Sequence, residues 1–136
     1  MRPHNTRKEF DRCWGWLDAS LASFGRTHRK DQVWERIYNG HANLWPGVNA
    51  VILSEIIRHP IGLKSCNVWL QGGELQEILP IHPHLEEWAR EHECDRLIAW
   101  GRRGWLHVLD GWHDCGARRG KWLRDDIPDH LRGTKT

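Results

Sequence analysis

Apolar and polar positions alternate most regularly between residues 50 and 123, where short apolar runs surround one long helical segment. Four runs have the length and the residue types of strands. They are Ala50–Arg58, Lys64–Leu70, Arg96–Trp100 and Cys115–Leu123. A segment of helical periodicity follows Gln71-Gly72-Gly73 and ends near Glu93, and a shorter helix is expected at Trp105–Leu109.

The part of the chain before residue 50 predicts two helices and a short strand. From Arg7 to Phe24, apolar residues recur at spacings of three and four, as they do on one face of an amphipathic helix. A second helix, capped by Thr27 or Asp31, is expected to end before Gly40. His41–Trp45 alternates and runs into a Pro-Gly turn, which is typical of a strand.

The expected order is two helices, three antiparallel strands, a helix, a strand, a helix and a last strand. We therefore predict a single α/β (α+β) domain over residues 1–136, a length that suits one core. Its mixed, mostly antiparallel central sheet is flanked by helices and preceded by two N-terminal helices. Residues 1–6 are expected to be a loose leader, and the polar residues 124–136 a surface tail.

Tryptophan dominates the aromatic residues, with ten Trp against one Tyr and two Phe. Each indole buries a large area and needs a partner for its N–H group. We therefore expect a core built around indoles. Trp69, in a central strand, and Trp88, in the long helix, are expected to belong to it.

Cysteine and histidine spacing gives no sign of a metal site. The four cysteines are far apart and no C-x-x-C occurs, so neither a zinc site nor a disulfide framework is indicated. The clusters His82-Pro83-His84 and His92-Glu93-Cys94 lack the spacing that brings ligands onto one ion. No stretch resembles a signal peptide or reaches membrane-spanning length, so we expect synthesis in a cytoplasm and no membrane partner.

The net charge of +2 is nearly balanced, but the basic residues gather near the C-terminus. Between Arg96 and Arg124 there are seven basic residues against two acidic ones, with four tryptophans interleaved. The basic residues are Arg96, Arg102, Arg103, Arg118, Arg119, Lys121 and Arg124. Such a region can bind nucleic acid through phosphate contacts and base stacking, or it can be a solvated face over a tryptophan core.

Several motifs between Thr27 and about Leu123 form a recognisable signature. They are THxxxxVW (Thr27 to Trp34), LWPG (Leu44–Gly47), ILSEIIRHP (Ile52–Pro60), WLxGGEL (Trp69–Leu75), EEWAREHEC (Glu86–Cys94) and GRRGWLHVL (Gly101–Leu109). The chain resembles the small GNAT-like proteins (Gcn5-related N-acetyltransferase fold) of tailed bacteriophages and prophages. The resemblance implies a GNAT fold. Some short-tailed phages carry such a protein in the virion, so it also implies a possible role in the particle or its assembly.

In active members of that fold, an R/Q-x-x-G-x-G/A loop between the central strand and the long helix holds the CoA pyrophosphate on its backbone N–H groups. Here the corresponding loop is shortened to Gln71-Gly72-Gly73, which leaves these three residues as weak candidates for cofactor binding. The Asn and the Tyr of active members correspond to Gly101 and about Val108, and neither side chain can donate a proton. His107 is the weak catalytic candidate that remains.

Three functions follow from these observations. The first is a non-catalytic GNAT-like phage protein, associated with the virion or its assembly, that binds other phage structural proteins or further copies of itself and needs no cofactor. The second is an acetyl-CoA-dependent N-acyltransferase with a rearranged site, and the third is a nucleic-acid-binding accessory protein. For the first, the expected partner-binding residues are Arg102, Arg103, Arg118 and Arg119; cations at a helix N-terminus, such as the first two, oppose the helix dipole and so suggest an external partner.

Overall fold

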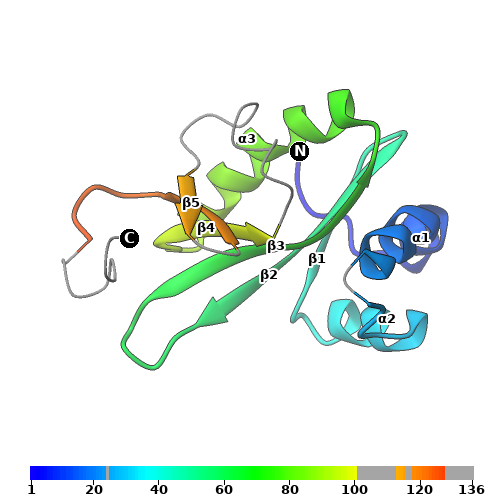
Figure 1. Cartoon of the computed structure of the whole chain (residues 1–136), viewed down its shortest axis with the longest axis horizontal. Helices are drawn as coiled ribbons and strands as arrows, with labels where there is room; N and C mark the ends of the chain where they lie inside the picture. Colours follow the sequence, from blue (N-terminus) through cyan, green and yellow to red (C-terminus); the bar gives the residue numbers. More distant parts are fainter. Residues whose placement is uncertain (24, 101–112, 116–117, 128–136) are drawn as a thin grey trace.

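The structure, a computed structural model, describes residues 1–23, 25–100, 113–115 and 118–127 (Figure 1). The helices are α1 (Arg7–Ala22), α2 (Lys30–Tyr38) and α3 (Leu75–Glu91). The strands are β1 (Asn43–Pro46), β2 (Ala50–Arg58), β3 (Lys64–Gly73), β4 (Arg96–Trp100), β5 (His113–Cys115) and β6 (Arg118–Trp122).

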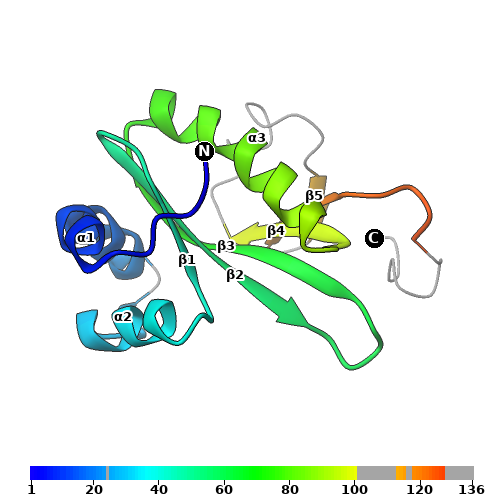
Figure 2. The ribbon, with the colours of Figure 1, turned by 180° about the vertical axis from the view of Figure 1, so that it is seen from behind.

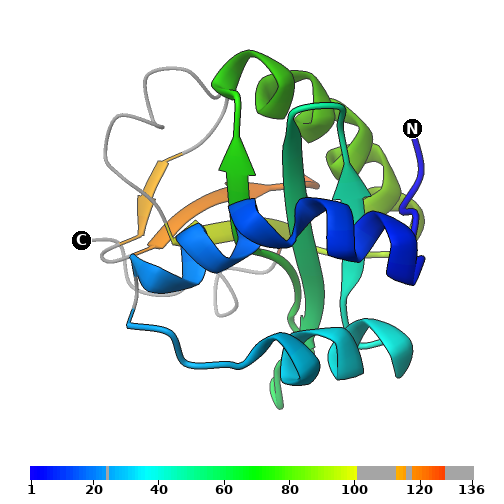
Figure 3. The same cartoon turned by 90° about the vertical axis from the view of Figure 1, so that its right-hand side faces the viewer.

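The strands form one mixed sheet in the order β1-β2-β3-β4-β6-β5. Only the β3–β4 pair is parallel, because α3 connects these two strands as a crossover. The helices α1 and α2 lie on one face of the sheet and α3 lies on the other, as Figures 2 and 3 show from two sides. This arrangement confirms the predicted fold class.

Each face of the sheet has its own apolar core. The α3 face contains Trp45, Cys66, Val68, Leu85 and Trp88, among others. The α1 and α2 face has a core built on Phe10, Leu17, Val33, Leu53 and Leu70, with several half-buried tryptophans around it. Trp88 is buried as predicted, whereas Trp69 is only half-buried at the margin of the second core.

A bulge divides β3 into two parts. Its partner β2 pairs Leu53 with Leu70 but Ser54 with Val68, so Trp69 is an extra residue opposite the Leu53–Ser54 step. Side chains alternate along a strand, and one inserted residue reverses the alternation. Accordingly Val68 belongs to the core on the α3 face, whereas Leu70 belongs to the core under α1 and α2.

The helix starts differ partly from the expected ones. Thr6 caps α1, its hydroxyl accepting the N–H group of Glu9. The cap of α2 is Arg29, and neither Thr27 nor Asp31 takes that place. Gln32 explains the difference, because its side-chain oxygen accepts the Arg29 N–H group at 2.9 Å. A residue of the first helical turn thus provides the hydrogen bond at the start of α2.

Some strand bounds also need correction. The run Cys115–Leu123, expected as one strand, contains β6 at Arg118–Trp122, whereas Cys115 ends the separate strand β5, which pairs antiparallel with β6. The predicted strand His41–Trp45 lies at Asn43–Pro46, and β3 runs three residues past Leu70. The helix α3 continues through both of its prolines. The helix expected at Trp105–Leu109 lies outside the described residues.

Residues 1–6, expected to be a loose leader, lie along β1 and reach α3. The N–H group of His4 donates to the carbonyl of Leu44 at 2.8 Å, and the Asn5 side chain accepts the Leu44 N–H group. Arg2 forms an ion pair with Glu91 on α3. At the other end, Ile127 is buried although it belongs to the expected polar tail, and residues 128–136 lie outside the described part of the chain.

Candidate functional site

The predicted cofactor-binding residues lie where β3 meets α3. The strand remains paired with β2 up to its last residue, Gly73, which lies opposite Ala50. The helix begins at Leu75, so Glu74 alone separates the two elements. Gln71, Gly72 and Gly73 are therefore part of a paired strand and do not form a loop.

Close packing explains both glycines at this junction. A Cβ atom on Gly72 would lie 2.8 Å from the carbonyl oxygen of Trp16 in α1. A Cβ atom on Gly73 would lie 2.2 Å from the carbonyl oxygen of Asn49, and Gly73 has a φ of +99° that other residues rarely adopt. The glycines thus allow α1 and the β1–β2 turn to approach β3, without a requirement for a ligand.

The N–H groups around the junction already have partners in the protein. Gln71 donates its N–H group to the hydroxyl of Ser20 at 3.3 Å, and Glu74 donates its N–H group to the carbonyl of Asn49 at 2.8 Å. An anion at this place would have to compete with both. These two donors, at least, are used within the fold.

The start of α3 carries carboxylates. Glu74 is the N-cap residue, and Glu77 lies in the first turn, where its Oε1 accepts the N–H group of Asn49 at 2.8 Å. Hydrogen bonds from Asn49 lower the pKa of Glu77, so its negative charge is stabilised there. Arg12 of α1 holds the same turn from the other side, through the carbonyls of Gly47 and Val48. The helix start thus favours its own acidic side chains over an anionic ligand.

The β3–β4 pair ends early. The last paired residues are Val68 and Ala99, just before the bulge at Trp69. From Trp69 to Gly73, β3 has no β4 partner among the described residues. The Oε1 atom of Gln71 is buried there without a hydrogen-bond partner. Residues 69–73 of β3 are therefore bordered by a described strand on the β2 side alone.

The residues expected to bind a partner are only partly described. Arg102, Arg103 and the catalytic candidate His107 lie outside the described residues, as do Gly101 and Val108. The backbones of Arg118 and Arg119 lie in β6, paired with Trp100 and Ala99 of β4. The predictions for these side chains stay predictions.

Three other members of the basic C-terminal region bind inside the fold. Lys121 forms an ion pair with Glu86 of α3 at 3.0 Å. Arg96 donates to the hydroxyl of Ser65 at 2.8 Å, and its guanidinium lies 5.5 Å from the ring centre of Trp122. Arg124 pairs with Asp95. These three charges are therefore less available to a nucleic acid than the sequence suggests.

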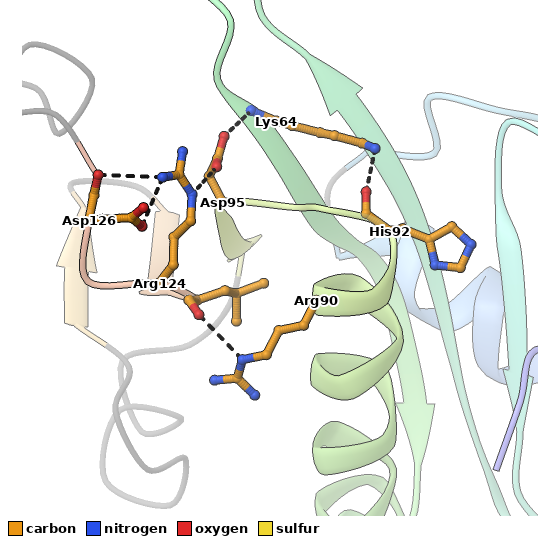
Figure 4. Close-up of polar contacts among 7 residues, drawn as sticks. Lys64, Arg90, His92, Asp95, Arg124 and Asp126 are labelled. Carbon is orange, nitrogen blue, oxygen red and sulfur yellow. Dashed lines mark hydrogen bonds and ion pairs between the residues drawn. The ribbon is translucent and has the colours of Figure 1, made fainter.

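Asp95 connects three strands at one end of the sheet (Figure 4). Its carboxylate accepts the backbone N–H group of Lys64 at 2.9 Å and the guanidinium Nε of Arg124 at 2.6 Å. Its own backbone pairs with Lys64 and with Leu123. Arg124 also contacts Asp126, and the Lys64 ammonium donates to the carbonyl of His92. The starts of β3 and β4 and the end of β6 are held together by this network.

The described residues contain no group of three or more metal-ligating side chains. Burial raises the pKa of the Cys13, Cys66 and Cys94 thiols, so these cysteines are poor nucleophiles. Burial also lowers the pKa of His82 to about 4, which keeps this histidine neutral at physiological pH. No helix in the described part of the chain has the length and apolar character needed to cross a membrane.

A polar cluster that the sequence did not predict lies on the α1 and α2 face. Glu55 of β2 and Asn67 of β3 lie directly opposite each other, and Arg36 of α2 binds Glu55. Trp69 and His28 lie beside them. The available signal was a carboxylate and an amide within two mostly apolar runs, AVILSEIIR and KSCNVWL.

Solved structures of two proteins share this fold. FeeM, an N-acyl amino acid synthase from uncultured soil microbes, aligns over 90% of this chain and 89% of its own, with a TM-score of 0.65 and 13% identity. Tetrahymena Gcn5 aligns over 90% of this chain and 92% of its own, with a TM-score of 0.57 and 8% identity. A scan against protein-family models finds no match, and neither does a search of curated proteins. The chain thus has the GNAT fold, and at these identities the likeness concerns the fold alone.

Proposed function

We propose that this chain is a non-catalytic GNAT-fold protein of a bacteriophage that acts through protein–protein contacts, in the virion or in its assembly. The phage context rests on the sequence motifs from Thr27 to about Leu123. The non-catalytic role rests on the junction between β3 and α3. Other phage structural proteins, or further copies of the chain, are the partners that this role requires.

One observation carries the proposal. The strand β3 stays paired with β2 through Gly73 and leads into α3 through the single residue Glu74. Two N–H groups near the helix start bind Asn49 and Ser20, and Glu74 and Glu77 bring negative charge to the same place. An acetyl-CoA pyrophosphate would meet occupied donors and two carboxylates, which opposes its binding.

Calorimetric titration with acetyl-CoA tests the proposal. We expect a dissociation constant above about 1 mM, equivalent to less than about 4 kcal/mol of binding free energy. Micromolar binding would contradict the proposal. In that case Gln76→Glu, which adds a third carboxylate to the first turn of α3, would show whether the ligand lies at the helix start, with Glu87→Gln near the far end of α3 as the control.

The partner contacts have a separate test. Arg102→Glu/Arg103→Glu should leave thermal melting unchanged or slightly raised, because carboxylates are favoured by a few tenths to about 1 kcal/mol at the N-terminus of a helix, which the sequence predicts at Trp105–Leu109. The same change should reduce incorporation into phage particles, measured by mass spectrometry, since attractive charge pairs become repulsive. Arg118→Glu/Arg119→Glu serves as the second variant. Unchanged incorporation of both would remove these arginines from the interface.

An acyltransferase with a rearranged site is the second candidate. The observation in its favour is that β3 has no β4 partner after Val68 among the described residues, so backbone groups on that edge are not used in the described sheet. Within the GNAT fold, His107 would be the residue to test for proton transfer. Acetyl transfer to an amine that His107→Ala abolishes, with melting unchanged, would establish this function in place of the first.

A further inference from the structure

The cluster of Arg36, Glu55 and Asn67 combines a paired carboxylate with a buried amide. Asn67 donates its Nδ2 group to Glu55 Oε1 at 3.0 Å, and Arg36 donates its Nη2 group to Glu55 Oε2 at 2.6 Å. Both carboxylate oxygens are therefore bonded, and the Glu55 side chain is only 16% exposed. The Nδ2 bond also fixes the orientation of the amide, because only nitrogen can donate to a carboxylate.

The other end of the Asn67 amide has no partner. Asn67 is 5% exposed, and its Oδ1 atom is buried without a hydrogen bond. A buried acceptor without a donor is costly, and most such groups in folded proteins are satisfied. The Oδ1 atom is therefore a vacant acceptor beside Glu55, suited to an incoming N–H or O–H group.

Two aromatic side chains, Trp69 and His28, belong to the same cluster. Trp69 lies two residues beyond Asn67 on the same strand and so faces the same side, and the guanidinium of Arg36 lies 5.5 Å from the Trp69 ring centre. The ring of His28 meets Trp69 edge-on, with centres 4.8 Å apart. A guanidinium thus already lies between an indole face and a carboxylate, the two groups that bind guanidinium most strongly.

We propose that Glu55, Asn67 and Trp69 form a binding site for the guanidinium of an arginine side chain on a partner protein, which displaces Arg36. This proposal rests on the proposed function, since it identifies one contact that the partner makes. Arg36 donates one hydrogen bond to Glu55 and its side chain is 38% exposed, so it can move into solvent. A displacing guanidinium has five N–H donors and can bond both Glu55 and the vacant Asn67 Oδ1.

The chemistry favours arginine over lysine. A guanidinium is planar, so it can lie on the indole while its edge bonds the carboxylate and the amide oxygen together. The exchange also leaves the charge of the cluster unchanged, because one cation replaces another. A guanidinium remains protonated at neutral pH and is not an acyl acceptor, so this contact is one of recognition, whereas an acyltransferase would require an amine.

The test uses the full chain with Arg36→Ala, which vacates the cluster, and Arg36→Met, which keeps most of the side-chain length should the alanine variant not fold. N-acetyl-arginine methylamide is titrated while the Trp69 indole N–H resonance is followed by NMR, assigned by its loss in Trp69→Phe. We expect binding to the vacated variants at least about tenfold tighter than to the unmodified chain. Adding Asn67→Ala should weaken it about tenfold, the effect of one hydrogen bond to a charged group. The lysine analogue should bind at least about tenfold more weakly than the arginine one.

Three results would overturn the proposal. These are no saturable shift of the Trp69 resonance on a folded vacated variant, equal binding of the arginine and lysine analogues, and binding that Asn67→Ala does not change. If the guanidinium site fails this test, the proposed function is not refuted, because the acetyl-CoA titration probes a different place, the start of α3. Micromolar acetyl-CoA binding would instead refute the proposed function while the guanidinium site could still be measured.

Discussion

Asp95 and Asn67 are equally buried, each 5% exposed, yet their side chains differ in how many of their polar atoms form hydrogen bonds. The Asp95 carboxylate accepts hydrogen bonds from Lys64 and Arg124. The Asn67 amide donates to Glu55, but its oxygen has no partner. Both residues lie on the parallel pair β3–β4 or at its start, so one short stretch of sheet contains a saturated polar group and an unsaturated one.

The difference separates a structural role from a binding role. A saturated buried carboxylate holds strands together, and its loss removes the acceptor of a backbone donor, here the Lys64 N–H group. An amide whose buried oxygen has no hydrogen bond adds little to stability, because the cost of the unpaired oxygen offsets the bond made by the nitrogen. Substitution at the two positions should therefore affect different measurements: unfolding for Asp95 and ligand binding for Asn67.

The largest effect is expected at Asp95. Asp95→Ala removes the acceptor for Arg124 and for the backbone of Lys64, and should lower the free energy of unfolding by about 3–5 kcal/mol, because two hydrogen bonds to a charged group, of about 1.5–3 kcal/mol each, are lost. Asp126→Ala is the matched control, because Asp126 binds the same arginine but its side chain is 80% exposed. We expect a change below about 1 kcal/mol for the control. Equal effects in urea unfolding would show that Asp95 is not the anchor of these strands.

A pH effect on stability is expected from His82, a third buried polar residue. Burial lowers its pKa from 6.5 to about 4, with Glu86 opposing the shift and Lys121 adding to it. The unfolded chain binds a proton near pH 6.5 and the folded chain does not, so stability is lost as the pH falls from about 6.5 towards 4. The loss amounts to about 3 kcal/mol, at 1.36 kcal/mol for each pH unit. Urea unfolding at several pH values measures it, and His82→Leu should flatten that part of the curve.

A smaller effect is expected at the β3–α3 junction. Gly72→Ala places a methyl group 2.8 Å from the Trp16 carbonyl oxygen, and should destabilise the fold by about 1–3 kcal/mol. Gly15→Ala is the control, since nothing lies within 4 Å of its Cβ position in α1. There alanine should stabilise by up to about 1 kcal/mol. A neutral Gly72→Ala would mean that the junction can open, which would favour a ligand at this place.

The smallest effect on stability is expected at Asn67. Asn67→Ala removes one hydrogen bond to Glu55 together with the unpaired oxygen, two contributions of opposite sign. The free energy of unfolding should change by less than about 1 kcal/mol, measured against Asp95→Ala under the same conditions. A loss as large as that of Asp95→Ala would place Asn67 among the structural residues and weaken the comparison.

Much of the fold was predictable because it depends on local patterns. The bounds of β2 and β4 were predicted at Ala50–Arg58 and Arg96–Trp100, and those of α1 nearly so, since each has a clear periodicity and a marked end. The end of β3 was not, because Gln71, Gly72 and Gly73 owe their conformation to pairing with residues 50–52. A strand that ends in glycines has no local sign of such pairing.

The candidate site was less predictable than the fold. Gln71, Gly72 and Gly73 were correctly placed beside α3, but the contacts of Trp16 and Asn49 that account for the glycines come from distant segments. The cluster around Glu55 and Asn67 depends on strand register, and the partner Arg36 comes from another helix. Register and helix packing are tertiary properties, so a single sequence does not specify which polar residues meet.

The bulge at Trp69 reverses the alternation of side chains along β3, so that even-numbered residues face opposite sides of the sheet before and after it. Before it, the even-numbered residues Cys66 and Val68 point into the α3 core; after it, the even-numbered Leu70 lies in the core under α1. Deleting Trp69 would remove the bulge without turning the strand over, because Leu70 would follow Val68 directly and still lie opposite Leu53. The helix α1 would keep its contact with the bare backbone of Gly72. At this step the chain should therefore tolerate the loss of one residue, a change that reverses the faces of a strand without a bulge.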